Sequence, residues 1–249
     1  MGWMIINRPR RRNALNAAMW SAIPPTIAEL ADDPAIRMIA IRGEGAEAFS
    51  AGADISEFAE NRADEARAAA YEALNGAAFQ ALRDCRKPVI ALISGFCFGG
   101  GLALALACDL RIASETALFC LPPARLGLAY PAAGLRDLVA AVPLSTAKDM
   151  IFTARRVAAE EALRLGLIDR LVQAKDFERA VPLAFSDIAE NAPLTLTHAK
   201  RCLDMIAGRP GAASPAEIAD LAAACFNSAD YREGQRAFLE KRKPGFGGA

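Results

Sequence analysis

The feature that most constrains this chain is an uncharged stretch over residues 89–109, VIALISGFCFGGGLALALACD, in which the first charge is its last residue. A run of about twenty uncharged residues is long enough to cross a bilayer as a helix. However, residues 90–93 form a short strand-like run, and the glycine triplet at residues 99–101 then interrupts the segment. The stretch therefore predicts a buried strand, a glycine turn and a buried helix over residues 102–108, and not a membrane span.

The glycine triplet is the first candidate site. Glycines at a strand-to-helix junction leave backbone N–H groups bare at the start of a helix, where they favour a negatively charged ligand atom. The alternative is that the glycines only allow close packing of the strand against the helix. The spacing fits neither G-x-G-x-x-G nor G-x-x-x-x-G-K-[ST], so a nucleotide-phosphate site is a poor match.

Composition limits the class of protein. The 249 residues are 53% hydrophobic, with 29 acidic and 29 basic side chains, which predicts a globular protein without bulk attraction to nucleic acid or anionic membranes. Six cysteines without a C-x-x-C pair indicate buried, reduced thiols, and the single histidine argues against an imidazole-rich metal site. No metal is therefore expected. The N-terminus lacks a secretory signal, so a cytoplasmic protein is expected.

A second strand-to-helix junction follows residues 48–50, where Ala51, Gly52 and Ala53 precede Asp54. Small side chains there would let a ligand approach the backbone closely, although a tight turn without a ligand gives the same pattern. Three consecutive arginines at residues 10–12 form an earlier turn. They predict either a solvated surface or a local phosphate contact.

The order of the expected elements is mixed strands followed by helices, which favours an α/β core with a helical C-terminal region. Strands are expected at residues 3–6, 36–41, 48–50, 90–93, 110–113 and 117–120. Residues 121–134 are expected to be an irregular connection that contains Tyr130. Helices, the first capped by Asn13 or Asn16, are expected up to residue 30 and at residues 63–84, 102–108, 135–142, 145–152, 158–165, 177–191, 193–206, 215–227 and 229–242.

Six segments in chain order closely resemble the crotonase family, also called the enoyl-CoA hydratase/isomerase family. They are INRPRRRNALN (6–16), AFSAGADI (48–55), GFCFGGGLALALACDLRIAS (95–114), LGL with a following proline (126–131), FTARRVAAEEALRLGLIDRLV (152–172) and AFLEKRKPGF (237–246). The resemblance implies an α/β fold, a crotonase-like spiral of ββα units over residues 1–190. It also implies a helical trimerisation region over residues 191–249, assembled as a homotrimer or hexamer.

The resemblance implies an acyl-CoA thioester as ligand and no separate cofactor. By position, the backbone N–H groups of Ala53 and Gly100 would form an oxyanion hole for the thioester carbonyl, whose oxygen becomes negatively charged in an enolate. The residues implied to contact coenzyme A are Arg10, Arg12, Ala14, Ala51, Asp54 and Ile55, joined from the C-terminal region, often of a neighbouring subunit, by Phe238 and Lys241.

The chain departs from the hydratases of the family at the acid/base positions. Ala103 and Pro123 stand where those hydratases carry two glutamates, and Pro131 stands at a further acidic position used by some isomerases. None of these side chains can transfer a proton, and hydration normally uses positioned carboxylates. Two other acidic residues, Glu57 and Glu60, follow the turn at residues 51–53 and are expected to face solvent.

Three interpretations of the site therefore stay open. The first is an enzyme that stabilises a thioester enolate by a reaction that does not use the two glutamates. The second is a decarboxylase of malonyl-type thioesters: Tyr130 lies at the spacing of a tyrosine in the family's decarboxylases, which carry a histidine where this chain has Ala53. The third is a non-catalytic acyl-CoA binder. Tyr130 could also be a packed loop anchor, and Cys97 and Cys120 are expected to be core residues.

Overall fold

Parallel strands form the framework of the computed structural model, which describes residues 1–61, 63–177 and 186–248. Within these residues one sheet has five parallel strands, in the order β1 (Gly2–Ile6), β2 (Ile39–Gly43), β4 (Val89–Ile93), β6 (Leu110–Ser114) and β9 (Arg170–Val172). A second sheet has the order β3 (Ala48–Ser50), β5 (Phe96–Phe98), β7 (Leu118–Cys120) and β8 (Val157–Ala158), in which only the last pair is antiparallel.

The central strand of the larger sheet explains the apolar run in the sequence. All five residues of β4 are buried, since β2 and β6 pair with its edges and side chains pack on both of its faces. Strands covered on both faces are continuously apolar rather than alternating. The second half of the same run forms α4 (Gly100–Ala107), in which every residue after Gly100 is buried.

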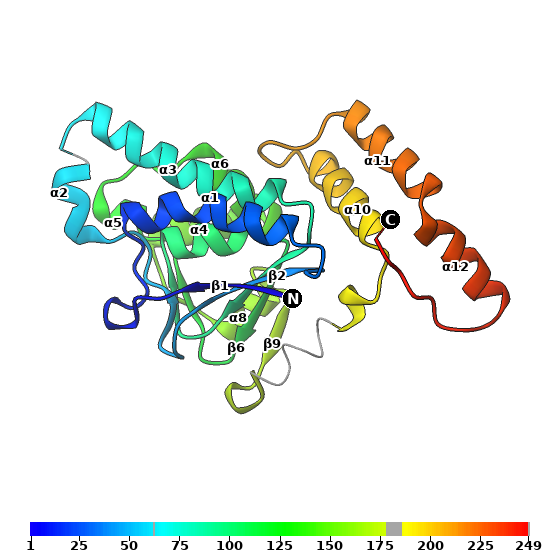
Figure 1. Ribbon diagram of the computed structural model, residues 1–249. Coiled ribbons are helices and arrows are strands. Elements are labelled where there is room, and N and C mark those ends of the chain that lie inside the picture. Colours follow the sequence, from blue (N-terminus) through cyan, green and yellow to red (C-terminus); the bar gives the residue numbers. More distant parts are fainter. Residues whose placement is uncertain (62, 178–185, 249) are drawn as a thin grey trace.

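Two long helices cover the strands on the side where α4 lies, as Figure 1 shows. They are α1 (Ala17–Asp32), whose N-cap Asn16 accepts the N–H of Met19, and α3 (Glu65–Asp84). Helix α1 buries Trp20, Ile23 and Ile27, a spacing that places all three side chains on one face. These helices bury the apolar surface of the strands and carry one wall of the site described below.

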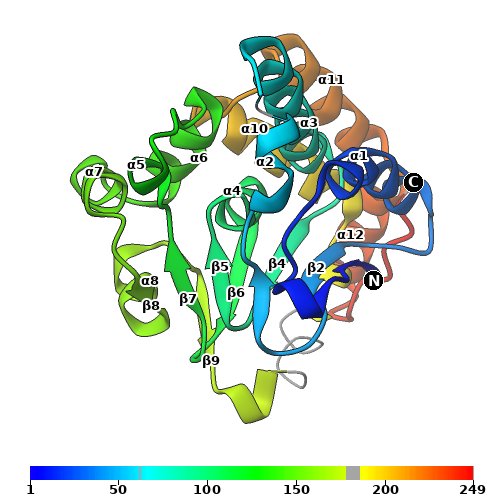
Figure 2. The same cartoon turned by 90° about the vertical axis from the view of Figure 1, so that its left-hand side faces the viewer.

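Shorter helices lie between the strands or, in the case of η3, just after the last one, and three longer helices form the C-terminal region of the described residues. The shorter helices are η1 (Pro9–Arg11), η2 (Ile55–Glu57), α2 (Phe58–Asn61), α5 (Pro123–Leu126), α6 (Ala132–Ala141), α7 (Leu144–Thr153), α8 (Ala159–Leu165) and η3 (Ala174–Asp176). The C-terminal helices are α10 (Pro193–Ile206), α11 (Pro215–Asn227) and α12 (Ala229–Leu239). They extend as an arm beside the sheets (Figures 1 and 2).

Most of the expected elements are present, and the differences concern short ones. The strand expected at residues 36–41 begins at Ile39 and ends at Gly43, and β5, β8 and β9 were not expected. Residues 121–134, expected to be irregular, contain α5 and the start of α6. Elements of two to four residues are too short to show a hydrophobic period. Most of the helix expected at residues 177–191 lies outside the described residues.

No helix in the described part of the chain has the combined length and apolar character that crossing a membrane requires. The uncharged stretch of residues 89–109 is divided instead among β4, β5 and α4, as the glycine triplet indicated.

Candidate active site

The two glycine-containing turns meet because β3 and β5 are parallel neighbours. The turn at Ala51, Gly52 and Ala53 follows the carboxyl end of β3, and Gly99 and Gly100 follow that of β5. Carboxyl ends of adjacent parallel strands open on the same edge of a sheet, where ligands bind in many α/β proteins. A Cβ atom built on Gly52 would lie 3.2 Å from the amide nitrogen of Gly100, so the two turns are in contact.

The amide of Ala53 is directed away from the neighbouring backbone. Leu15 pairs with this turn: its N–H donates to the carbonyl of Gly52 at 2.8 Å, and its carbonyl accepts from Asp54 at 2.9 Å. Because successive N–H groups of an extended backbone point to opposite sides, the N–H of Ala53 points away from Leu15. Within the described residues the structure gives this N–H no hydrogen-bond acceptor.

The amide of Gly100 is the first of α4 and, among the described residues, likewise donates no hydrogen bond. The first N–H groups of a helix have no partner within the helix. Gly99, at φ +50° and ψ −119°, supplies the turn that starts the helix. A Cβ atom built on Gly100 would lie 3.5 Å from the amide nitrogen of Ala53, so the two N–H donors lie side by side.

These two turns form part of a cavity of about 140 Å³. Most of its lining is apolar or backbone, and the polar side chains in it are Glu72, Asn75 and Tyr130. The cavity brings together most of the positions singled out from the sequence, namely Ala51, Ala53, Ile55, Gly100, Ala103, Pro123, Tyr130 and Pro131. Ala103 and Pro123, at which the resemblance predicts that glutamates of the hydratases have been replaced, therefore place inert side chains in this cavity wall.

Tyr130 lies in the cavity wall between α5 and α6. Its ring packs against the first turn of α6, because a Cβ atom built on Gly134 would lie only 2.7 Å from Cε1 of the ring. Its hydroxyl oxygen is buried and has no hydrogen-bond partner among the described residues. Burial, with a smaller contribution from the charge of Asp137, raises the pKa of this phenol above its usual range. The hydroxyl is therefore protonated near neutral pH and can donate a hydrogen bond.

Helix α3 supplies three cavity residues that the sequence did not single out. Glu72 and Asn75 lie three residues apart, and Phe79 follows four residues later, so all three share one face of the helix. Asn75 is buried, and its Oδ1 atom has no hydrogen-bond partner among the described residues. The signal in the sequence is weak, because α3 is alanine-rich and carries several other charged residues.

The N-terminal residues expected to contact coenzyme A, between Arg10 and Ile55, lie in segments that hydrogen bonds connect beside the cavity. Arg8, which the sequence analysis did not single out, donates from one guanidinium nitrogen to the carbonyl of Ala14 and to the carboxylate of Asp54, each at 2.9 Å. Arg12 pairs with Glu47 at 2.7 Å, and its carbonyl accepts the N–H of Ala51. The side chains of Arg10 and Arg12 are exposed, as is Ile55.

Asp54 is an anchor in this group. The hydroxyl of Ser56 and the guanidinium of Arg8 hold the pKa of its carboxyl below the usual value, although burial acts in the opposite direction. Its carboxylate also accepts the N–H of Ser56, the first N–H groups of η2 being otherwise unsatisfied. Asp54 therefore stays ionised and fixes the turn that presents the N–H of Ala53.

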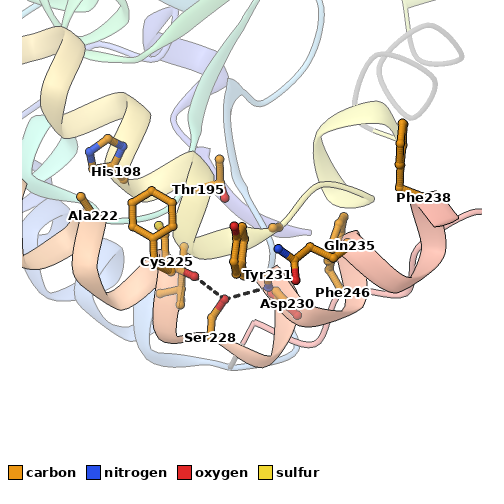
Figure 3. Close-up of a pocket in the computed structure, with 14 residues that line it drawn as sticks. Thr195, His198, Ala222, Cys225, Ser228, Asp230, Tyr231, Gln235, Phe238 and Phe246 are labelled. Carbon is orange, nitrogen blue, oxygen red and sulfur yellow. Dashed lines mark hydrogen bonds between the residues drawn. The ribbon is translucent and has the colours of Figure 1, made fainter.

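Phe238 and Lys241 do not line this cavity. Phe238 is at the end of α12, 83% exposed, and stands apart from the other labelled side chains in Figure 3. It contributes to a larger groove of about 570 Å³ between the C-terminal helices, which also contains the half-buried His198. Within one chain the structure thus separates these two residues from the other predicted contacts (Figure 1).

The other residues considered from the sequence are Glu57, Glu60, Cys97 and Cys120. Glu57 is half-buried and accepts the N–H of Ala17 at the start of α1, whereas the side chain of Glu60 lies outside the described ones. Cys97 and Cys120 are buried core residues, as expected, and burial raises the pKa of both thiols. In the described part of the chain no group of three or more histidine, cysteine, aspartate or glutamate side chains could hold a metal ion.

Known proteins share this architecture along its whole length. The short-chain-enoyl-CoA hydratase of Clostridium acetobutylicum is 34% identical over 96% of this chain and 90% of its own. The crotonyl-CoA hydratase of Syntrophomonas wolfei is 35% identical over 98% of this chain and 93% of its own. A crystal structure of an enoyl-CoA hydratase/isomerase family protein from Hyphomonas neptunium, at 42% identity, has a TM-score of 0.91 and covers 98% of this chain and 93% of that one.

The family model described as enoyl-CoA hydratase/isomerase matches residues 2–249, nearly the entire chain. The match includes both turns, the cavity and the C-terminal helices, so it does not depend on one motif. The chain therefore belongs to the enoyl-CoA hydratase/isomerase family and has the crotonase fold.

Proposed function

We propose that this protein binds a short acyl-CoA thioester and stabilises its enolate through the N–H groups of Ala53 and Gly100. The observation that carries the proposal is that these two donors lie side by side, without acceptors among the described residues, at the wall of a mostly apolar cavity. Fixed donors in a dry site stabilise a developing oxyanion strongly; removal of one such donor elsewhere costs about 3 to 4 kcal/mol.

The size of the cavity favours a short acyl group. A volume of about 140 Å³ lies below the 300–1,000 Å³ or so that is typical of sites for drug-sized ligands. Two relatives have names that specify a short substrate, short-chain-enoyl-CoA hydratase and crotonyl-CoA hydratase. A chain of about four carbons would fill the space between α3 and the loop that carries Tyr130.

The coenzyme A part would lie along the group held by Arg8. There the exposed guanidinium groups of Arg10 and of Arg12, which is ion-paired with Glu47, would contact the phosphates, and the backbone near Ala14 and Ala51 would contact the adenine. Asp54 would act by holding the turn, and Ile55 by apolar contact at the cavity mouth. The thioester brings the coenzyme with it, so the reaction needs no separate cofactor.

We also infer that copies of the chain associate, as a trimer or a pair of trimers. Phe226, Phe238 and Leu239 on α11 and α12 are 65–83% exposed, which is unusual for large apolar side chains gathered in one region. Association would cover them. It would also allow Phe238 and Lys241 to reach the coenzyme A held by a neighbouring subunit, because neither residue reaches the cavity of its own chain.

Calorimetric titration with butyryl-CoA, dodecanoyl-CoA and free coenzyme A tests the proposed acyl site. Butyryl-CoA should bind at least about tenfold more tightly than coenzyme A, because each buried CH₂ contributes about 0.8 kcal/mol. Dodecanoyl-CoA should gain nothing further. Equal affinities for butyryl-CoA and coenzyme A, or no saturable binding of either, would refute the proposal.

A cavity-filling variant localises the effect. Ala103→Leu places a larger side chain in the cavity wall, so the preference for butyryl-CoA should disappear while free coenzyme A still binds. Ala73→Leu makes the same change at an exposed position of α3 and should leave the preference intact. An unchanged preference in Ala103→Leu would place the acyl group elsewhere.

A second candidate is decarboxylation of a malonyl-type thioester, favoured by the buried, unpartnered hydroxyl of Tyr130 in the cavity wall. Loss of CO₂ forms the enolate directly, and a protonated phenol could orient the leaving carboxylate. The carboxylate of Glu72 in the same wall would repel that group, which favours the first proposal. Release of CO₂ from malonyl-CoA, lost in Tyr130→Phe, would reverse this order.

A further inference from the structure

We propose that Glu72 of α3 is the catalytic base of this protein, removing a proton from C2 of the bound thioester. The inference rests on the proposed function, because it requires an acyl group in the cavity and an enolate oxygen at Ala53 and Gly100. It moves the proton-transfer group from the positions of Ala103 and Pro123 to α3, a different helix of the cavity wall.

The position of Glu72 is fixed by the face of α3 that it shares. Phe79 is buried and Asn75 is 8% exposed, and both line the cavity. Asn75 and Glu72 lie four and seven positions before Phe79, so the three side chains project from the same face of the helix. The half-buried side chain of Glu72 is part of the same lining. The face of α3 that lines the cavity therefore carries a carboxylate, that of Glu72.

Glu72 carries the only carboxylate among the described residues that line the cavity. The three positions where the family's acids would lie, Ala103, Pro123 and Pro131, are in the same lining and are inert. Asp54 is the nearest other acid in sequence to the turn of Ala53, but it does not line the cavity. Among the described lining residues, Glu72 is therefore the one whose side chain carries a carboxylate that could accept a proton.

The polar groups around Glu72 form a patch that faces the place of the acyl chain. Glu72, Asn75 and Tyr130 are the polar side chains of this lining, and the charge of Glu72 makes a small contribution to raising the pKa of Tyr130. Asn75 Oδ1 and the Tyr130 hydroxyl are both buried without partners among the described residues. These atoms are available to hold a ligand group or a carboxylic acid formed on Glu72.

The chemical step balances without a co-reactant. The carboxylate of Glu72 takes a proton from C2, the C–H electron pair forms a C1–C2 double bond, and the carbonyl π pair moves to the oxygen held by Ala53 and Gly100. The acid formed on Glu72 can return the proton to C2. In a substrate with a C3–C4 double bond it can instead deliver the proton to C4, leaving a C2–C3 double bond.

One carboxylate suits such a proton shift better than hydration, which also needs an activated water. The predicted activities are therefore exchange of the C2 hydrogens of butyryl-CoA with solvent, and conversion of 3-butenoyl-CoA to crotonyl-CoA. Deuterium uptake from D₂O, followed by mass spectrometry, measures the first. The rise of conjugated-thioester absorbance measures the second.

Glu72→Gln should lower both rates by a factor of about 10² or more, as expected for loss of a general base, while butyryl-CoA still binds. Glu65→Gln changes an exposed acid in the first turn of the same helix and should leave both rates unchanged. Formate, a small carboxylate, should restore part of the exchange in Glu72→Ala. A merely structural role for Glu72 would give no such rescue.

Two outcomes would overturn the assignment. Wild-type rates in Glu72→Gln would show that another group moves the proton. Binding of butyryl-CoA by the wild type, with neither exchange nor isomerisation, would show that Glu72 is not a base. Absence of butyryl-CoA binding would instead remove the proposed function itself, so the two failures are distinguishable.

Discussion

At the scale of single residues, the cavity is supported by a buried charge cluster that the motifs do not reveal. Asp137 of α6 is 2% exposed and accepts from Arg83 of α3 at 2.7 Å and from Arg209, beyond α10, at 3.1 Å. Arg209 also donates to the carbonyl of Leu106 in α4. The cluster ties together α3, α4 and α6, the helices that carry Glu72, Gly100 and Gly134.

We expect Asp137→Ala to lower the free energy of unfolding by about 3 to 5 kcal/mol, because the buried guanidinium group of Arg83 loses its counter-charge and Arg209 is left with its longer ion pair to Asp204. Denaturant titration measures the change. Glu47→Ala is the control: its ion pair with Arg12 is largely exposed, and such pairs contribute at most about 1 kcal/mol. Similar decreases in the free energy of unfolding of the two variants would mean that the buried cluster stabilises the protein no more than an exposed ion pair does.

At the scale of elements, the geometry of the proposed oxyanion site depends on how closely α4 approaches β3. A Cβ atom built on Gly101 would lie 2.6 Å from the carbonyl oxygen of Ser50, closer than such atoms can approach. Ser50 is itself fixed, since its hydroxyl donates to the carbonyl of Asn13 and accepts the N–H of Gly52. The glycine triplet therefore has both properties considered for it from the sequence: Gly100 leaves an N–H group without an acceptor among the described residues, and Gly101 permits α4 to pack closely on β3.

Gly101→Ala should lower the free energy of unfolding by about 1 to 3 kcal/mol, as overpacking does, and should weaken butyryl-CoA binding by displacing Gly100. Gly76→Ala is a matched change in α3, where a Cβ atom meets nothing within 4 Å. It should stabilise the protein by about 0.5 to 1 kcal/mol, the penalty of glycine inside a helix. Thermal unfolding and calorimetry compare both variants with the wild type; unaltered binding in Gly101→Ala would contradict this account.

At the scale of the whole molecule, the C-terminal helices leave an apolar surface that the sheets do not cover. The groove between α10, α11 and α12 has mostly apolar lining, and Phe226 and Phe238 remain 65% and 83% exposed. Figure 3 shows side chains from all three helices around it. Burial of such side chains in an assembly would stabilise it by roughly 25 cal/mol for each Å² of apolar area removed from water.

Phe238→Asp should therefore shift the protein towards monomers, because it places a charge in the proposed interface. Phe238→Leu keeps an apolar side chain and should preserve the assembly. Light scattering coupled to size-exclusion chromatography, over a range of concentrations, gives the mass of each. A wild-type protein that is monomeric throughout would rule out the proposed self-association.

The sequence identified the backbone part of the candidate site well, because glycine and alanine turns between apolar runs have few structural solutions. It placed the turns at Ala53 and Gly100, the strand β4 and the buried α4. It also placed Tyr130 in a loop near these turns, where it lines the cavity. Local pattern sufficed here, since each feature depends on residues close together in the chain.

Only the tertiary structure decided which side chains face those turns. Glu72 and Asn75 lie on an alanine-rich helix without a distinctive motif, and the partner of Arg8 is 46 residues away along the chain. Short strands such as β5 and β9 exist because neighbouring strands pair with them, and a period cannot be read from three residues. The sequence by itself thus determined the family and the α/β core, and it indicated the two turns at Ala53 and Gly100. Packing between distant segments decided the cavity wall, because the side chains there are brought together by α3 and the loop before α6 and not by spacing along the chain.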